Sequence, residues 1–240
     1  AMVNAIKKAE KYIYIENQYF ISQHKNGPSA LKNQIANALA DKIIQKIESS
    51  QEFCVYIILP MFPENGDPDG WRCQKFLHLE FQTIQYIYTR ITEALNARAA
   101  KNSDANVNPT DYLQVYCLGK LESEARLDFD VNSLKKGRHR EVVDHKRYMV
   151  YVHSKLMIVD DEYIMVGSAN INERSLANNR DTEIAIGAVR LPRRQQNVDE
   201  APDVHQPNAA MNAEHGVGEK HHAPSTPNGE QSIAQFRSQL

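Results

Sequence analysis

Cysteine is scarce in this sequence, and none of it is arranged for metal binding or redox exchange. The three cysteines among the 240 residues are Cys54, Cys73 and Cys117, and no two of them form a CxxC pair. Cys54 and Cys117 lie in apolar runs typical of strands, so we predict buried free thiols. Thiols of this kind are typical of a reducing compartment, which favours a cytoplasmic location.

Long hydrophobic runs and a strong charge of either sign are also lacking. No apolar run approaches 18 residues and no signal-peptide pattern is present, so we expect any contact with a membrane to be peripheral. The net charge of −2 gives no bulk signal for nucleic acid, and no nucleic-acid partner is expected.

One segment lacks the residues that build a core. From Pro192 to Gly229 there is no Leu, Ile, Phe, Tyr or Trp, and such a segment cannot offset the entropy cost of ordering. We therefore predict a folded domain over 1–190 and a disordered low-complexity insertion over 191–229. Residues 230–240 are interpreted as the start of a truncated terminal helix, so the chain is expected to be a piece of a longer protein.

The remaining 190 residues alternate between helical and strand-like patterns. The run FCVYIILP at 53–60 is continuously apolar, as in a strand buried on both faces. Ser29 is a candidate cap for a helix that follows it. We predict an α/β domain, a layered mixed β-sheet flanked by helices. The predicted helices are 2–11, 30–48 and 71–100, and the predicted strands are 12–21, 53–60, 113–119, 149–160, 163–168 and 183–189.

Five polar positions at fixed offsets interrupt two of the apolar strands. The pattern is His153-x-Lys155-x4-Asp160-x6-Gly167-Ser168-x-Asn170. Strand alternation places His153 and Lys155 on one face. Burial of either side chain without a partner is costly, so an anionic ligand is expected beside them.

These residue types suit a phosphate ester. The Lys155 ammonium can neutralise phosphate oxygens, and the His153 imidazole can attack phosphorus or transfer a proton. Gly167 allows a close backbone approach, and the Ser168 hydroxyl and Asn170 amide can bind further oxygens.

Two acidic positions complete the candidate set. Asp160 lies near the end of a strand and is expected to fix the turn or a neighbouring loop rather than touch substrate. The imidazole of His153 needs a partner on its second nitrogen to set its tautomer. Glu183 at the start of the last strand is the first candidate for that partner, and Asp181 is a weaker alternative.

The pattern resembles the HxKxxxxD signature, followed by GSxN, of the phospholipase D superfamily. Its surroundings resemble the carboxy-terminal half of eukaryotic phospholipases D, and most of all the plant type. The matching stretches are IYIENQYF at 13–20, LPMFPE at 59–64, the helix at 71–95 and the run at 151–188.

The resemblance implies a fold of two α/β halves, each giving one His-Lys motif to a shared site. In that scheme one histidine attacks phosphorus to form a phosphohistidine, and the other protonates the leaving alcohol and then activates water or a primary alcohol. The resemblance implies that His153 is the general acid/base and that Glu183 orients His153. It also implies phosphate binding by Lys155, Gly167, Ser168 and Asn170. Asp160 belongs to the motif, and no metal is implied.

One departure from the family pattern limits what this chain does alone, because only one such motif is present. The expected partner is the first half of the same polypeptide or a second copy of the chain. No C2 module is recognised, so calcium is expected to act only through a module outside these residues. Glu16, Asn17 and Gln18 match a family signature and are interpreted as lining the pocket or as a hydrogen-bond cluster at a strand end.

The sequence thus predicts a phospholipase D that hydrolyses phosphatidylcholine-type lipids to phosphatidic acid and choline. Transphosphatidylation is a further expected reaction. It is expected in the cytoplasm at the surface of phospholipid membranes. Two alternatives stay open: a homodimeric single-motif phosphodiesterase or phosphatidyltransferase, and a catalytically inert half that binds lipid headgroups.

Overall fold

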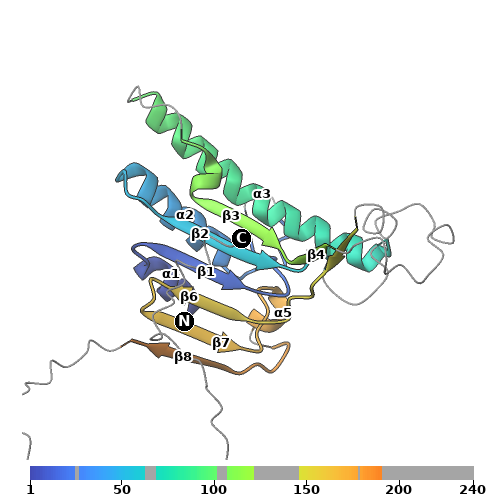
Figure 1. Ribbon diagram of the computed structural model, residues 1–240. Helices are drawn as coiled ribbons and strands as arrows, with labels where there is room; N and C mark the ends of the chain where they lie inside the picture. The colour runs from blue at the N-terminus through green and yellow to red at the C-terminus, as the bar shows by residue number, and fades with distance from the viewer. Residues whose placement is uncertain (25–26, 63–68, 102–106, 122–145, 178, 191–240) are drawn as a thin grey trace, which may run out of the picture. The chain divides into compact units, whose positions relative to one another are not determined.

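A computed structural model describes residues 1–24, 27–62, 69–101, 107–121, 146–177 and 179–190 (Figure 1). These residues belong to one compact unit, Ala1–Arg190. The predictions for 191–229 and 230–240 lie outside the described residues.

The domain is organised around a six-stranded sheet with the order β3-β2-β1-β6-β7-β8. Strands β1, β2 and β3 are parallel, whereas β6, β7 and β8 each run antiparallel to their neighbours. The prediction of a mixed sheet is therefore confirmed. The bounds are β1 Tyr12–Glu16, β2 Cys54–Leu59, β3 Leu113–Cys117, β6 Leu156–Val159, β7 Tyr163–Gly167 and β8 Ala185–Val189, and a separate ribbon pairs β4 Gly119–Leu121 with β5 Arg147–Met149.

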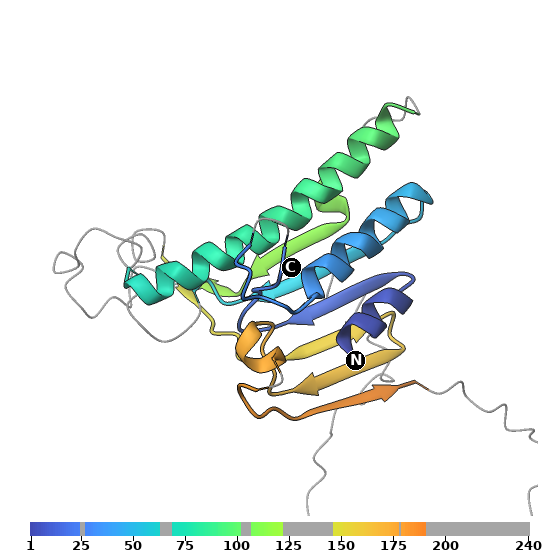
Figure 2. The ribbon, with the colours of Figure 1, turned by 180° about the vertical axis from the view of Figure 1, so that it is seen from behind.

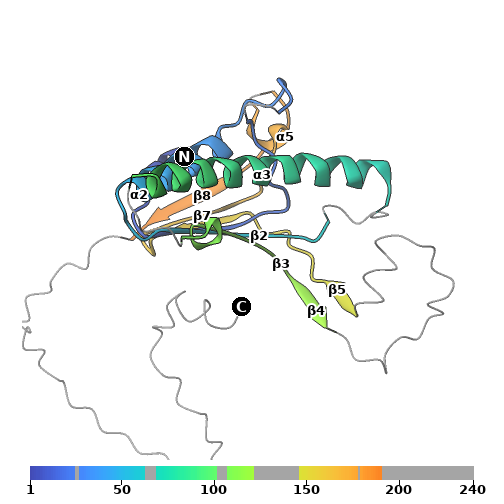
Figure 3. The ribbon, with the colours of Figure 1, turned by 90° about the horizontal axis from the view of Figure 1, so that it is seen from above.

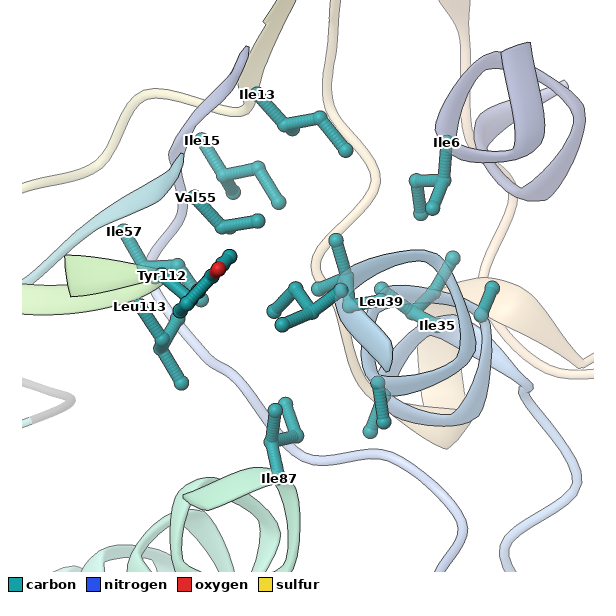
Figure 4. Packing of buried hydrophobic residues seen from close by; sticks show 14 of the residues in the cluster. Ile6, Ile13, Ile15, Ile35, Leu39, Val55, Ile57, Ile87, Tyr112 and Leu113 are labelled. Carbon is teal, nitrogen blue, oxygen red and sulfur yellow. The ribbon is translucent and has the colours of Figure 1, made fainter. Parts of the chain in front are cut away.

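Three helices pack against one face of this sheet, as Figures 2 and 3 show. They are α1 Met2–Lys8, α2 Ile35–Glu48 and α3 Trp71–Ala99, and two short elements, η1 Pro109–Asp111 and α5 Glu173–Leu176, lie in connections. Alternate residues of the parallel strands point toward the helices and are fully buried (Figure 4). This layer of the core includes Ile13, Ile15, Val55, Ile57 and Leu113 from the sheet and Leu39 and Ile87 from the helices.

The predicted start of the second helix was wrong, because α2 begins at Ile35 with Gln34 as its cap and Ser29 is exposed. The cause is a tertiary contact. The backbone amides of Lys32 and Asn33 donate to the Glu173 carboxylate of α5 at 2.8 and 3.2 Å. These amides thus find an acceptor outside their own segment, and the helix does not begin until Ile35.

Two predicted strands are shorter than expected at their amino-terminal ends. Leu156 pairs with Glu16, the last residue of β1, so β1 ends before it can pair with residues 150–155. Among the described residues, this segment keeps only the backbone bonds from the Val150 amide to Leu118 and from the Gly167 amide to Lys155. The last strand begins at Ala185 rather than at Glu183.

The prediction of two buried strand thiols was half right. Cys54 is buried, but Cys117 is exposed, because it ends β3, which is an edge strand of the sheet. Within the described ranges, no helix combines the length and the apolar character that a membrane span needs.

Candidate active site

The candidate site lies where β1 and β2 end and β6 begins. His153 is exposed and Lys155 is partly buried, and both lie in the extended segment before β6 rather than in a paired strand. Contacts nevertheless hold the alternate residues together, because the His153 ring stacks on Tyr151 and the Lys155 ammonium donates to the His153 carbonyl. The backbone carbonyl of Lys155 accepts a hydrogen bond from the Gly167 amide at 3.1 Å, which brings the end of β7 beside the site.

The Lys155 ammonium is held by two oxygen acceptors. It donates to the backbone carbonyl of His153 at 2.6 Å and to Oε1 of Gln18 at 3.1 Å. Burial lowers the pKa of Lys155, and the Glu183 carboxylate opposes this by raising it. A partly desolvated ammonium held in place by uncharged oxygens has a high electrostatic attraction for an incoming anion.

The imidazole of His153 stacks on the ring of Tyr151. Their centroids are 6.1 Å apart and their planes differ by 25°. The phenol oxygen of Tyr151 in turn accepts a hydrogen bond from Nε2 of Gln18 at 2.8 Å. Sequence reasoning missed Tyr151, although the alternation that pairs His153 with Lys155 places residue 151 on the same face.

The turn after β7 brings Ser168 and Asn170 to the same end of the sheet. The Ser168 hydroxyl donates to the Glu183 carboxylate at 2.5 Å and accepts from the Ile184 amide at 3.0 Å. Oδ1 of Asn170 is buried and, among the described residues, has no hydrogen-bond partner. An unmatched buried amide oxygen is costly, so this oxygen offers an open position for a hydrogen-bond donor of a ligand.

Gly167 has a packing role at this turn. A Cβ atom on Gly167 would lie 2.5 Å from the carbonyl oxygen of Ile184 and 2.7 Å from Cβ of Ala185. The residue therefore lets β7 approach the start of β8 closely, rather than opening the backbone to a phosphate.

Glu183 has a different partner from the one predicted. Its carboxylate accepts the Ser168 hydroxyl, whereas the ring contact of His153 is with Tyr151. The cause is local, since the hydrogen bond from Ile184 to Ser168 places the neighbouring Glu183 side chain beside that hydroxyl. The alternative, Asp181, forms an ion pair with Arg174 at 3.0 Å.

Asp160 lies at the opposite end of β6 from Lys155. Its carboxylate accepts the backbone amides of Glu10, Lys11 and Tyr12 at 2.6 to 2.8 Å. Asp160 therefore fastens the connection between α1 and β1, as expected for a residue that fixes a loop. Although Asp160 belongs to the motif, its side chain does not lie at the candidate site.

The Glu16-Asn17-Gln18 cluster divides into three separate environments. Glu16 accepts the hydroxyls of Tyr14 and Ser154 on the other face of the sheet. Asn17 is 1% exposed, and its Oδ1 accepts the amides of Tyr19 and Ile171 at 3.2 and 3.0 Å. Only Gln18 reaches Lys155, because the chain bends there.

The donor set of this site is that of an anion site. A lysine, a histidine, a serine and an asparagine meet at one end of the sheet, and these groups bind and transfer phosphoryl esters. In the part of the chain that the structure describes, no three His, Cys, Asp or Glu side chains gather to hold a metal ion.

Comparison with known proteins places this geometry in context. A family model described as "Phospholipase D" matches residues 1–239. Phospholipase D delta of Arabidopsis thaliana is 43% identical over 192 residues, which cover 78% of this chain and 21% of that protein. Phospholipase D alpha 1 of Oryza sativa subsp. japonica is 40% identical over 197 residues, which cover 78% of this chain and 24% of that protein.

Among solved structures, Nuc from Salmonella typhimurium, described as a phospholipase D family member, superposes with a TM-score of 0.39. The two sequences are 13% identical, and the match covers 80% of this chain and 74% of that one. The chain spans about a fifth to a quarter of the length of the curated relatives it matches.

Proposed function

Because this chain belongs to the phospholipase D family, we propose that it is the second catalytic half of a plant-type phospholipase D, which hydrolyses phosphatidylcholine-type lipids to phosphatidic acid and choline. The observation that carries the proposal is the constellation at the end of β1, where the Lys155 ammonium is held by Gln18 and by the backbone carbonyl of His153, whose imidazole is exposed. The identity of about 40% to plant phospholipases D supports the same chemistry.

In the proposed reaction, a histidine of the other half attacks the phosphorus of the diester. The bond from phosphorus to the choline oxygen breaks, and His153 gives its proton to that oxygen. His153 then takes a proton from water as the water oxygen attacks phosphorus, and the bond from phosphorus to histidine nitrogen breaks. A primary alcohol in place of water gives transphosphatidylation. Lys155 and the amide nitrogen of Asn170 stabilise the charge on the non-bridging oxygens, while Ser168 gives its hydroxyl proton to Glu183 and holds that carboxylate in place.

The other half is proposed to be the first half of the same polypeptide, since the chain covers only about a quarter of its relatives. An apolar patch beside β8 supports a partner. Four side chains on one face of β7, β8 and the residue before it are 41 to 74% exposed: Ile164, Val166, Ile184 and Ile186. A patch of this kind is typical of a surface that another domain covers.

The proposed substrate is a membrane lipid, so the protein is proposed to act as a peripheral protein at phospholipid surfaces. The free thiols favour the cytoplasm as the proposed compartment. In the proposed reaction, histidine and lysine side chains carry out each step at phosphorus without a metal ion.

The test is a choline-release assay on phosphatidylcholine vesicles. The chain is assayed alone and mixed with a first-half fragment, and each assay is repeated with His153→Ala and with His78→Ala, an exposed histidine on α3 that serves as the matched control. Activity that appears only in the mixture and is lost only in His153→Ala supports the proposal.

Other outcomes separate the alternatives. Activity of the chain alone with second-order dependence on its concentration supports a homodimeric phosphodiesterase. Binding of vesicles without choline release in any mixture supports an inert headgroup-binding half. Undiminished activity of His153→Ala contradicts the catalytic assignment.

A further inference from the structure

Tyr151 contacts the site histidine and has no part in the reaction proposed above. The ring of Tyr151 lies 6.1 Å from the His153 ring, centroid to centroid, in a stacked arrangement. His153 is exposed, and an exposed imidazole without a neighbour would sample several rotamers. The stacked ring therefore restricts where the imidazole points.

The orientation of Tyr151 is set by the amide of Gln18, which is 8% exposed. The Lys155 ammonium can only donate hydrogen bonds, so the amide oxygen of Gln18 must face Lys155. The amide nitrogen then faces the Tyr151 phenol oxygen and donates to it at 2.8 Å. A single side chain thus fixes both the cation and the aromatic ring.

Gln18 is itself held by its neighbours in the chain. Oδ1 of Asn17 accepts two backbone amides, one from Tyr19 and one from Ile171. The Phe20 amide donates to the buried Glu80 carboxylate at 2.9 Å. Because the backbone is fastened on both sides of Gln18, its amide is a fixed reference for the two groups that it binds.

We propose that Gln18 and Tyr151 are positioning residues that couple Lys155 to His153, so that the ammonium and the imidazole face the same phosphate. The coupling runs from Lys155 through the Gln18 amide to the Tyr151 phenol and from the Tyr151 ring to His153. The effect of this coupling on catalysis rests on the proposed function. The coupling itself is a structural property of this chain and can be tested without activity.

The coupling is tested first by NMR on the chain, with histidines labelled at carbon ε1 and the His153 signal assigned by its loss in His153→Ala. A ring stacked on an imidazole shifts its proton signals. Tyr151→Leu is expected to move the His153 signal toward that of the exposed His78. Tyr151→Phe keeps the ring but loses the hydrogen bond from Gln18, so it is expected to act like Gln18→Leu. Gln18→Leu is expected to move the signal in the same direction as Tyr151→Leu although it leaves the ring in place.

Tyr116→Leu is the matched control, because Tyr116 is an exposed tyrosine on β3 whose hydroxyl donates to Gln114 of its own strand. It should leave the His153 signal unchanged. Unchanged His24 and His78 signals show that each variant is folded. A His153 signal that does not respond to Tyr151→Leu, or that responds to it but not to Gln18→Leu, overturns the coupling.

The second readout is kinetic and uses the chain assembled with its first half. Gln18→Leu and Tyr151→Leu are each expected to lower kcat about tenfold with little change in KM, since misplacement of a reacting group acts on the chemical step. The double variant should lose no more than either single variant. Losses that multiply in the double variant contradict a shared role. An NMR coupling in a protein without choline release would leave the positioning intact and reject the proposed function.

Discussion

The backbone amide of Tyr12 donates a hydrogen bond of 2.8 Å to Oδ1 of Asp160, although the two residues are 148 positions apart in the chain. The amides of Glu10 and Lys11 converge on the same carboxylate. Asp160 also has a positive φ of 55°, a conformation that Asp and Asn tolerate better than most residues. Thus the aspartate of the motif joins the amino terminus of the domain to the β6–β7 turn.

Asp160→Asn is therefore expected to act on stability. The amide keeps one oxygen acceptor and the left-handed backbone but loses the charge and the second acceptor, which costs about 1–3 kcal/mol of unfolding free energy. Urea denaturation measures the loss. Asp161→Asn is the control, because the Asp161 carboxylate accepts an exposed hydrogen bond from the Tyr12 hydroxyl rather than backbone amides. If Asp160→Asn instead abolishes activity at unchanged stability, a direct catalytic role replaces this one.

Glu80 gives a prediction about pH. Its carboxylate is 5% exposed, and burial raises its pKa from 4.5 to about 7. Between these pH values the folded chain holds a proton that the unfolded chain has lost, so this group makes stability fall as pH rises from about 4.5 to about 7.

Glu80→Gln is expected to remove this fall. The amide oxygen still accepts the Phe20 amide, so the variant should match the parent at pH 4.5 and exceed it at pH 8 by on the order of 2–3 kcal/mol. Urea denaturation across this pH range is the measurement, with Glu93→Gln, an exposed glutamate of the same helix, as the control. An equal pH slope in the parent and in Glu80→Gln would show that Glu80 titrates normally.

The sequence pattern was sufficient for the architecture because that architecture follows from local periodicity. The apolar run at 53–60 predicted a central strand, and β2 has parallel neighbours on both sides. The spacing of His153 and Lys155 also predicted a shared face, and in the structure Gln18 and Tyr151 connect the two residues.

The predictions from which the structure departs depend on contacts between separate segments of the chain. Ser29 was displaced as a helix cap because Glu173 of α5 takes the amides of Lys32 and Asn33. Glu183 binds Ser168 because the β7–β8 pairing sets their register. No single-segment pattern contains either contact.

Glu183 provides a prediction about the charge state of Lys155. The Glu183 carboxylate raises the pKa of Lys155 against the larger lowering by burial, because a nearby negative charge favours the ammonium. In Glu183→Gln that attraction is removed, so the pKa of Lys155 should fall below its value in the parent chain.

The measurement is an NMR pH titration of reductively ¹³C-methylated lysines, with the Lys155 signal assigned by its loss in Lys155→Arg. Glu162→Gln, an exposed carboxylate at the β6–β7 turn, should leave the Lys155 titration in place. A Lys155 pKa that rises or stays constant in Glu183→Gln would contradict the electrostatic coupling.

Gly167 and Gly187 lie on the same strand pair but differ in what a methyl group would meet. At Gly167 the added Cβ would lie 2.5 Å from the backbone oxygen of Ile184, whereas at Gly187 it would lie 2.9 Å from the hydroxyl of Tyr163. The carbonyl oxygen of Ile184 belongs to the backbone and cannot move without shifting β8, whereas the Tyr163 hydroxyl can turn aside with its side chain.

Gly167→Ala is therefore expected to cost about 1–3 kcal/mol of unfolding free energy, and Gly187→Ala less than about 1 kcal/mol. Ser168 follows Gly167 and Glu183 precedes Ile184, so a shift at this contact moves both side chains. Gly167→Ala should therefore also lower kcat in the assembled enzyme, while Gly187→Ala should not. Urea denaturation and choline release measure the two effects. Equal stability of both variants, or a greater loss in Gly187→Ala, would mean that β7 and β8 can separate at Gly167 and that the close approach there is not what holds Ser168 against Glu183.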